Sequence, residues 1–350
     1  MPGKPDFERF RTAVLRETPD RVPLGELIID NVVIQPWVGR PCDSMEVYME
    51  FLVAAGYDFA RVTPHIDFNP DKVPPKEGLR IGKAHEKDWD RTWSPEGQGV
   101  ITSWDDLERH RWPTPEDVDY APLHDAYACL PDGMKIVAHH GDIFTTAWAL
   151  MGFETFCFAL AEDPDLVAAV YERIGRVVLR AFEVMADLPG VGAMWYSDDI
   201  AYTEGLLVSP AHFRAELFPR MKAIGDMCRA KNIPFLYHTD GVLWEVMEDI
   251  IDCGVDCIQP IEPKAMDIIE VKRRYGDRLS VMGNIDLGYT LTRGTPEETA
   301  EEVRERLRTV GPGGGYILGS SNTISNYVLY DNYRAMVETT LASGNYPISC

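Results

Sequence analysis

The chain has 350 residues, of which 45% are hydrophobic and 26% are charged, as is ordinary for a globular protein with a real core. It carries 34 Lys and Arg against 56 Asp and Glu, which gives a formal net charge of −22. This acidity argues against nucleic-acid binding and against docking on anionic membranes, because both functions need a basic surface.

The first residues predict a helix at about 6–17 and contain no apolar stretch typical of a signal peptide. No apolar run approaches transmembrane length. The seven cysteines are an odd number, which together with the absent signal peptide indicates a reducing compartment. We therefore expect a cytoplasmic protein.

Short strand-like runs then alternate with longer helical patterns almost to the end of the chain. The predicted strands are 22–29, 57–64, 135–141, 193–200, 234–241, 257–263, 279–286 and 315–322. Helical patterns lie at 43–55, 146–162, 164–187, 210–231, 242–253, 265–275, 296–309 and about 328–343. Eight strand-then-helix units predict an α/β fold, the closed (β/α)8 or TIM barrel. An open doubly wound sheet is the alternative, although it seldom needs eight units.

One segment, 75–118, breaks this rhythm and is rich in Pro, Gly and Trp. Part of it, "LRIGKAHEKDWDRTWS", alternates like a hairpin, so we expect an insertion after the second strand that covers one end of the barrel. Its tryptophans, which include Trp89, Trp93, Trp104 and Trp112, would form either a packed lid or a docking surface. We expect residues 1–350 to form a single domain that contains this insertion.

Polar side chains gather where the predicted strands end. In barrels of this kind the active site lies at the carboxyl ends of the strands, so we expect an active site there. The residues are Glu26, Asp30, Asn31, Thr63, His65, Asp67, His139, His140, Asp142, Ser197, Asp198, Asp199, His238, Asp240, Gln259, Glu262, Asn284, Asp286, Ser320, Ser321 and Asn322.

The stretch "YHTDG" contains His238 and Asp240, two residues apart at the end of the fifth strand, and therefore on the same side of it. Glu262 ends the next strand and could converge with them. One imidazole and two carboxylates suit zinc or another divalent ion, so His238, Asp240 and Glu262 are candidate metal ligands. An acid/base or substrate-binding role, or simple capping of the following helix by Asp240, are the alternatives.

Asp198 and Asp199 are neighbours at the end of the fourth strand, so only one of them should face the barrel mouth. Two nearby carboxylates can raise a pKa for proton transfer. The simpler alternative is a cap for the following segment. His139 and His140 are subject to the same constraint.

Three stretches, "FLYHTDGVLWEVMEDIIDCGVDCIQPIEP", "GDRLSVMGNIDLGYTLTRGTPEETAEEV" and "GGGYILGSSNTI", together resemble the uroporphyrinogen decarboxylase superfamily. The opening "FERFRTAVLRETPDRVPLGE" resembles the amino-terminal helix and first strand of that family. The resemblance spans nearly the whole chain in order and implies a (β/α)8 barrel. It also implies one of two chemistries, which are metal-free decarboxylation and zinc-dependent methyl transfer involving corrinoid proteins.

The resemblance departs from the true decarboxylase at its functional positions. Where that family has an arginine-rich stretch for substrate carboxylates, this chain reads "LGELIIDNVV". His65 stands at the place of the catalytic aspartate, and Trp148 stands at the place of a tyrosine. Ser320 replaces a histidine. We therefore do not expect decarboxylation of uroporphyrinogen.

The methyltransferase branch binds zinc through an H-x-C pattern after the fifth strand and a cysteine after the eighth, with a glutamate after the sixth in one subgroup. His238 and Glu262 match this pattern, whereas Asp240 and Ser320 replace the two thiolates. Carboxylate ligands would make a zinc ion harder and would suit an oxygen-bearing substrate at least as well as a thiol.

The resemblance thus implies a methyltransferase-like enzyme that acts on a small methylated substrate or on a methyl-corrinoid protein. A divalent metal such as zinc would be its cofactor, corrinoid would enter only through a partner protein, and the chain would form a homodimer. The alternatives are a metal-free decarboxylase of another carboxylic acid and a non-catalytic corrinoid- or ligand-binding homologue.

Residue roles follow from this hypothesis. His65, Asp198, Asp199 and His238 are the candidate catalytic residues, and His238, Asp240 and Glu262 are the candidate metal ligands. The candidate substrate-binding residues are Glu26, Asn31, His140, Trp148, Asn284, Ser320 and Asn322.

Overall fold

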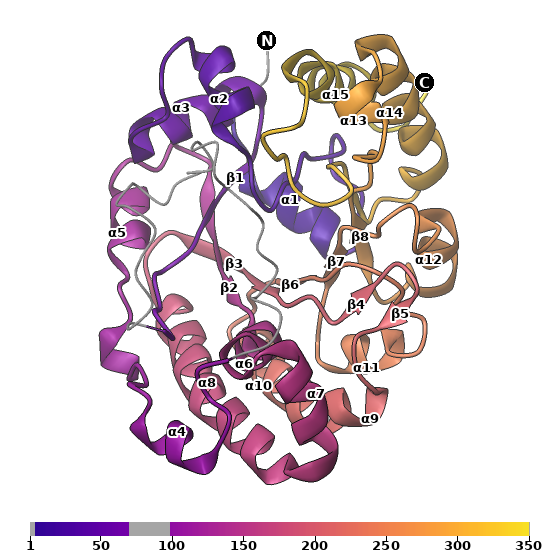
Figure 1. The fold of residues 1–350 in the computed structure, drawn as a ribbon. Helices are drawn as coiled ribbons and strands as arrows, with labels where there is room; N and C mark the ends of the chain where they lie inside the picture. Colours follow the sequence, from indigo (N-terminus) through magenta and orange to yellow (C-terminus); the bar gives the residue numbers. More distant parts are fainter. Residues whose placement is uncertain (1–3, 70–98, 350) are drawn as a thin grey trace.

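Seven parallel strands form the central sheet of the protein (Figure 1). The computed structural model describes residues 4–69 and 99–349. The spatial order is β1-β2-β3-β6-β7-β8-β9, and each neighbouring pair is parallel. The strands are β1 (Phe59–Val62), β2 (Lys135–Gly141), β3 (Val191–Ser197), β6 (Phe235–His238), β7 (Cys257–Gln259), β8 (Ser280–Met282) and β9 (Tyr316–Ile317).

Helices connect successive strands and surround the sheet (Figure 1). They are α1 (Phe7–Val14), α2 (Asn31–Val38), α3 (Met45–Ala55), α4 (Trp104–Arg109), α5 (Ala121–Ala128), α6 (Ile143–Met151), α7 (Phe153–Glu162), α8 (Pro164–Met185), α9 (Pro210–His212), α10 (Phe218–Ala230), α11 (Met247–Asp252), α12 (Ile268–Tyr275), α13 (Thr290–Arg293), α14 (Pro296–Val310) and α15 (Tyr330–Ser343). A two-stranded hairpin, β4 (Ala201–Tyr202) and β5 (Gly205–Leu206), follows β3.

The strand predicted at 22–29 joins the edge of β9 by isolated bridges only. Leu24 pairs with Leu318 in parallel, and Leu318 donates its N–H to the carbonyl of Pro23 at 2.9 Å. Proline has no N–H to give to a ladder, which keeps this pairing short. The prediction of an α/β fold with a curved parallel sheet is therefore confirmed, while a ladder that closes the barrel onto β1 is not seen among the described residues.

Side chains alternate between the two faces of the sheet. Phe59, Trp195 and Met282 belong to an inner cluster that also contains Phe10 of α1, and the rings of Phe10 and Phe59 lie 4.3 Å apart. The intervening residues pack instead in the larger core with the surrounding helices. Helix α1 thus packs against the interior of the sheet at the amino-terminal ends of the strands.

Several predicted helices are divided in the structure. The helix predicted at 146–162 is two helices, α6 and α7, which meet at Gly152 (φ 77°) with an angle of 97° between them. The helix predicted at 210–231 contains a π-helical turn at Phe213–Leu217 between α9 and α10. Helix α2 was not predicted, although Asp30 ends the strand-like run and caps the helix by accepting the N–H of Val32.

Most of the insertion predicted at 75–118, including its hairpin, lies outside the described residues. The part from 99 onward contains α4 and a 3-10 turn, Pro115–Asp117. Among the described helices, no single one is both long and apolar enough to cross a membrane, and only the bent pair α6 and α7 passes that test jointly.

Candidate active site

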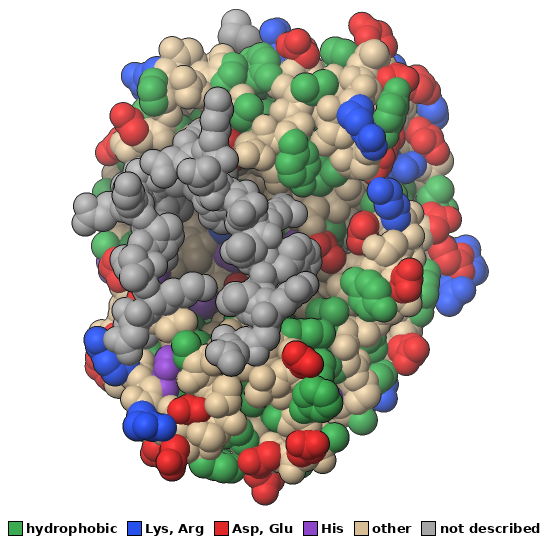
Figure 2. Space-filling view, in the orientation of Figure 1, with side chains coloured by type: hydrophobic (Ala, Val, Ile, Leu, Met, Phe, Trp, Pro, Cys, Tyr) green, Lys and Arg blue, Asp and Glu red, His purple; other side chains and the backbone are tan. Residues whose placement is uncertain are grey.

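The carboxyl ends of the strands surround a hollow in the molecular surface. In Figure 2, histidine side chains are visible within this hollow. The register places Ser197 of β3 beside His238 of β6, and His238 beside Gln259 of β7. Polar residues at the ends of three consecutive strands of the sheet therefore lie next to one another, as predicted for the mouth of a barrel.

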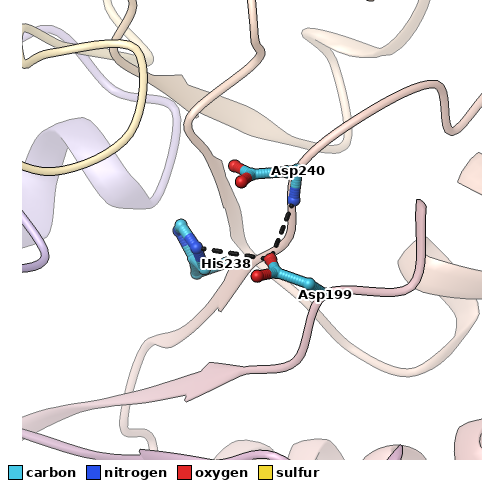
Figure 3. Close-up of side chains that lie close together, drawn as sticks. All are labelled: Asp199, His238 and Asp240. Atoms are coloured by element: carbon cyan, nitrogen blue, oxygen red, sulfur yellow. Dashed lines mark hydrogen bonds and ion pairs between the residues drawn. The ribbon is translucent and has the colours of Figure 1, made fainter. Parts of the chain in front are cut away.

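Asp199, His238 and Asp240 come together in this mouth (Figure 3). One potential ligand atom from each residue lies within 4.8 Å of the others. The Nε2 atom of His238 is 3.5 Å from Oδ1 of Asp199, and the same oxygen accepts the backbone N–H of Asp240 at 3.2 Å. One imidazole nitrogen and two carboxylates form a donor set that suits a divalent metal ion.

Gln259 fixes the orientation and tautomer of the buried His238 ring. The amide nitrogen of Gln259 donates to the carbonyl of Asn322 at 2.8 Å, so its oxygen faces Nδ1 of His238 at 2.5 Å. Nδ1 must then carry the proton, which leaves the lone pair of Nε2 directed toward Asp199. This is the arrangement that supporting groups give to metal-binding histidines.

Asp240 has one committed oxygen and one open oxygen. Oδ2 accepts a hydrogen bond from the amide of Asn322 at 2.6 Å, whereas Oδ1 is buried and has no hydrogen-bond partner. Burial raises the pKa of Asp240 to about 6, and the negative charges of Asp199 and Glu262 act in the same direction. Glu262 is thus near enough to affect Asp240, but it is not part of the three-residue group.

Asp198 and Asp199 face opposite ways, as the alternation of a strand requires. Asp198 is fully buried and accepts the N–H groups of Phe144 and Thr145 at 2.7 and 2.9 Å. It also accepts the hydroxyl of Tyr196 at 2.8 Å. Asp198 therefore binds the amino terminus of α6, where backbone N–H groups favour an anion, and the structure does not bring it to the Asp199 group.

Glu26 and Ser320 form a buried pair. The backbone N–H and the hydroxyl of Ser320 donate to the two oxygens of Glu26 at 2.6 and 2.7 Å. Desolvation raises the pKa of Glu26 to about 8, even though these two bonds oppose the shift. A neutral carboxyl group at physiological pH is therefore expected at this position.

His65 and His140 lie close enough for their charges to interact, since a charge on His65 lowers the pKa of His140. Burial is the larger cause, and the pKa of His140 falls to about 4. Nδ1 of His140 accepts the N–H of Gly141 at 2.7 Å. His140 is thus a neutral hydrogen-bonding group, and its Nε2 carries the proton.

The other candidate substrate-binding residues differ in what they can still bind. Asn31 Oδ1 and Trp148 Nε1 are buried and have no hydrogen-bond partner, so each could bind a ligand. The amide of Asn284 is already engaged, because it donates to the carbonyl of Ile261 at 2.7 Å and accepts from Arg306 at 3.0 Å.

Arg61 on β1 is a mouth residue that the sequence analysis missed. It donates to Thr63 Oγ1 at 2.7 Å and to His139 Nδ1 at 3.0 Å, while His139 Nε2 lies 2.9 Å from Ser197 Oγ. A signal was present, since Arg61 is two residues after the inward-facing Phe59 and two before Thr63. This spacing alone does not distinguish an arginine of the mouth from an exposed one.

Comparison with known families gives one matching family model, described as uroporphyrinogen decarboxylase (URO-D), over residues 91–342. Uroporphyrinogen decarboxylase from Coxiella burnetii is 28% identical over 262 residues, which cover 71% of this chain and 69% of that protein. Methylcobamide:CoM methyltransferase MtaA from Methanosarcina barkeri is 27% identical over 148 residues, which cover 42% of this chain and 41% of that protein.

A solved structure, a methyltransferase from Methanosarcina mazei, superposes with a TM-score of 0.66. The alignment covers 95% of this chain and 97% of that one, at 19% sequence identity. At this identity the likeness concerns the fold alone.

Proposed function

Since the chain belongs to the uroporphyrinogen decarboxylase family, we propose that it is a metal-dependent methyltransferase of that family. Its substrate would be a small methylated compound or a methyl-corrinoid protein. Relatives in both chemistries support an enzyme, and the resemblance to a methylcobamide:CoM methyltransferase supports this branch. The closed (β/α)8 barrel, with 22–29 as its first strand, and the single domain are part of the proposal.

The observation that carries the proposal is the group formed by Asp199, His238 and Asp240. Two features of these residues fit a metal ion. His238 presents the lone pair of Nε2, because Gln259 binds Nδ1, and the buried Oδ1 of Asp240 lacks any partner. Glu262 stays a proposed additional ligand, since its charge already acts on Asp240.

A bound divalent ion would supply a Lewis acid that activates an oxygen-bearing or thiol acceptor for methyl transfer. Gln259 and Asn322 position His238 and Asp240 through the bonds described above. Asp240 and Ser320 stand where the zinc pattern of the methyltransferase branch has its two thiolates, and Asp199 adds a second carboxylate, so we expect a harder site than a thiolate site. Asn31 and Trp148 would orient the substrate through their unpartnered polar atoms.

The test is metal analysis of the purified protein together with a methyl-transfer assay. We expect about one divalent ion per chain, as for a preformed protein site. The variant His238→Ala should lose the ion, whereas the control His212→Ala should keep it, because His212 is bound to Tyr171 outside the mouth. Demethylation of free methylcobalamin, with 2-mercaptoethanol or methanol as acceptor, should require the ion.

Two results would contradict the proposal. One is wild-type protein that binds neither zinc, cobalt(II) nor manganese(II) after removal and return of metal. The other is full methyl transfer by metal-free protein.

A second candidate function is decarboxylation of a carboxylic acid other than uroporphyrinogen, without a metal. The observation that favours it is Arg61, a cation in the mouth that could hold a carboxylate. Release of CO2 from a bound acid by metal-free protein would support this function over methyl transfer.

A further inference from the structure

Arg61 introduces a positive charge into a mouth that is otherwise acidic. Its side chain follows the inward direction of Phe59, which belongs to the inner core cluster. The hydrogen bond to His139 places the guanidinium between β1 and β2, inside the sheet. Arg61 therefore lies above the apolar interior, on the side where the strands end.

The guanidinium of Arg61 is only partly engaged. Nη1 makes both recorded bonds, to Thr63 and to His139. Nε is shielded from solvent and has no acceptor. No ion pair to a carboxylate is found for Arg61 among the described residues. The edge formed by Nε and Nη2, which is the edge that receives a carboxylate in a two-bond fork, is therefore open.

His139 cannot supply the missing negative charge, and it cannot replace Arg61 as the cation. It is buried beside Arg61, and both burial and the neighbouring guanidinium lower its pKa well below the ordinary value. Its two ring nitrogens are occupied by the Arg61–Thr63 pair and by Ser197. A neutral His139 thus holds the guanidinium in place without balancing its charge.

We propose that Arg61 binds the carboxylate of a small monocarboxylic substrate whose other end lies at Asp199, His238 and Asp240. The unused Nε–Nη2 edge would take both carboxylate oxygens, and this would satisfy the buried Nε donor. The inference rests on the proposed function for the role of the second end. The anion site itself stands on Arg61 alone.

The surrounding charges favour a monoanion over a phosphate. Asp199, Asp240 and Glu262 lie at or near the opposite wall of the mouth, so a dianion would meet more repulsion for the same single arginine. A carboxylate also matches the planar fork of the guanidinium.

The spacing of the strands limits the length of the substrate. Three steps across the sheet, β1 to β2 to β3 to β6, correspond to roughly 14 Å along its curve at about 4.8 Å per step. The side chains of Arg61 and His238 both point inward and shorten the remaining gap. The substrate class is therefore a short carboxylic acid with a methyl-bearing or oxygen-bearing far end.

The experiment is isothermal titration of the metal-loaded protein with acetate, methoxyacetate, butanoate and inorganic phosphate, and with the neutral methoxyacetamide as a matched probe. We expect at least one acid to bind and the amide to bind at least tenfold more weakly, as for loss of a charged hydrogen-bond pair. Arg61→Met should weaken acid binding about 10- to 100-fold. Arg61→Lys, which keeps the charge but not the fork, should fall between.

The matched control is Arg278→Met, which removes an arginine paired with Glu248 on the surface and should bind the acids like the wild type. Cobalt(II) titration of the same variants serves as an independent measurement. It should give the same metal affinity for Arg61→Met as for the wild type, which also shows that the variant is folded.

Three results would overturn the inference: no acid binds, the amide binds as well as its acid, or phosphate binds more tightly than every carboxylate. Equal acid binding by Arg61→Met and wild type would do the same. If wild-type protein binds no metal but binds acids through Arg61, the proposed metal function fails and the anion site stands. If the protein binds metal but no acid, the anion site at Arg61 fails and the proposed metal function stands.

Discussion

Among the described residues, charged side chains are paired at the amino-terminal end of the sheet and lack opposite partners at its carboxyl end. At the amino-terminal end, the fully buried Asp58 accepts bonds from Arg9 at 2.6 Å and from Arg21 at 3.3 Å. It also accepts the backbone N–H of Asp6 at 3.0 Å, and Arg9 in turn binds Asp20 through two nitrogens. Each of these side-chain charges has a partner of opposite sign.

At the carboxyl end the charges are separated. Asp199 and Asp240 lie together beside His238, without a Lys or Arg partner among the described residues, and Arg61 lies on β1 without a carboxylate. Buried polar atoms of Asp240, Arg61, Asn31 and Trp148 lack partners. Unsatisfied buried groups cost free energy in the folded state. Nη1 of Arg16, at the amino-terminal end, also lacks a hydrogen bond but lies 3.5 Å from a carboxylate oxygen of Asp256, whereas Arg61 at the carboxyl end has no such partner among the described residues, which suits that end to receive a ligand.

The comparison separates stability from function. A matched buried network adds little net stability, since burial still raises the pKa of Asp58 against the pull of its two arginines. Losing one member is nevertheless costly because the remaining charges stay buried. Substitutions at the carboxyl end, where the charges lack partners, should change ligand affinity strongly and the free energy of unfolding only slightly.

The largest expected effect is on folding, at the matched end. Asp58→Ala should lower the free energy of unfolding by about 3–5 kcal/mol, because the buried Arg21 would lose its carboxylate partner and Arg9 would keep only the exposed Asp20. Urea denaturation measures this change. Glu50→Ala, which breaks the exposed pair with Arg40, is the control and should cost less than about 1 kcal/mol. If Asp58→Ala also costs less than about 1 kcal/mol, the paired network at the amino-terminal end does not stabilise the fold in the way described.

The next effect is a pH dependence from Glu26. Its pKa is raised in the folded protein from 4.5 to about 8, so the folded state binds the proton more tightly than the unfolded state does. Its contribution to stability is full below pH 4.5 and is lost as the pH rises through about 8.

Glu26→Gln keeps the shape but cannot ionise; its oxygen can accept the N–H of Ser320, and its amide nitrogen then donates to the Ser320 hydroxyl. Relative to the wild type, it should gain about 4 kcal/mol of stability between pH 5 and pH 8.5. Chemical denaturation at both pH values gives this difference. An equal gap between the two proteins at pH 5 and pH 8.5 would show that Glu26 does not titrate as described.

A smaller effect tests the support of the metal group. Gln259→Leu removes the acceptor that fixes the Nδ1 proton of His238. Loss of such a supporting bond should weaken metal affinity about 10- to 100-fold, or about 1.4–2.7 kcal/mol. Competition with a chelator measures it. Unchanged affinity would mean that His238 is oriented by its packing alone.

The smallest effect concerns the committed oxygen of Asp240. Asn322→Ala removes one hydrogen bond to Oδ2 and should weaken metal affinity by about fivefold, which corresponds to about 1 kcal/mol. The same chelator competition detects it. A loss larger than that of Gln259→Leu would make Asn322, and not Gln259, the main support of the site.

Much of the site could be predicted because strand alternation is local. Two residues apart on one strand share a face, which placed His238 beside Asp240 and required Asp198 and Asp199 to face opposite sides. The same rule places Arg61 on the face of Phe59, two residues away. No local pattern, however, distinguishes an arginine in the mouth from an exposed one. Whether Asp198 or Asp199 faces inward depends on where α6 begins, since its first N–H groups bind Asp198.

By itself, the sequence determined the alternation of strands and helices, the polar strand ends and the His238–Asp240 pair, because each follows from the spacing of residues along one segment. Only the tertiary structure decided that Asp199 joins this pair while Glu262 lies outside the three-residue group, and that Glu26 meets Ser320. The tertiary structure also shows that no described carboxylate pairs with Arg61. Distances between strands depend on register and curvature, which no single segment contains.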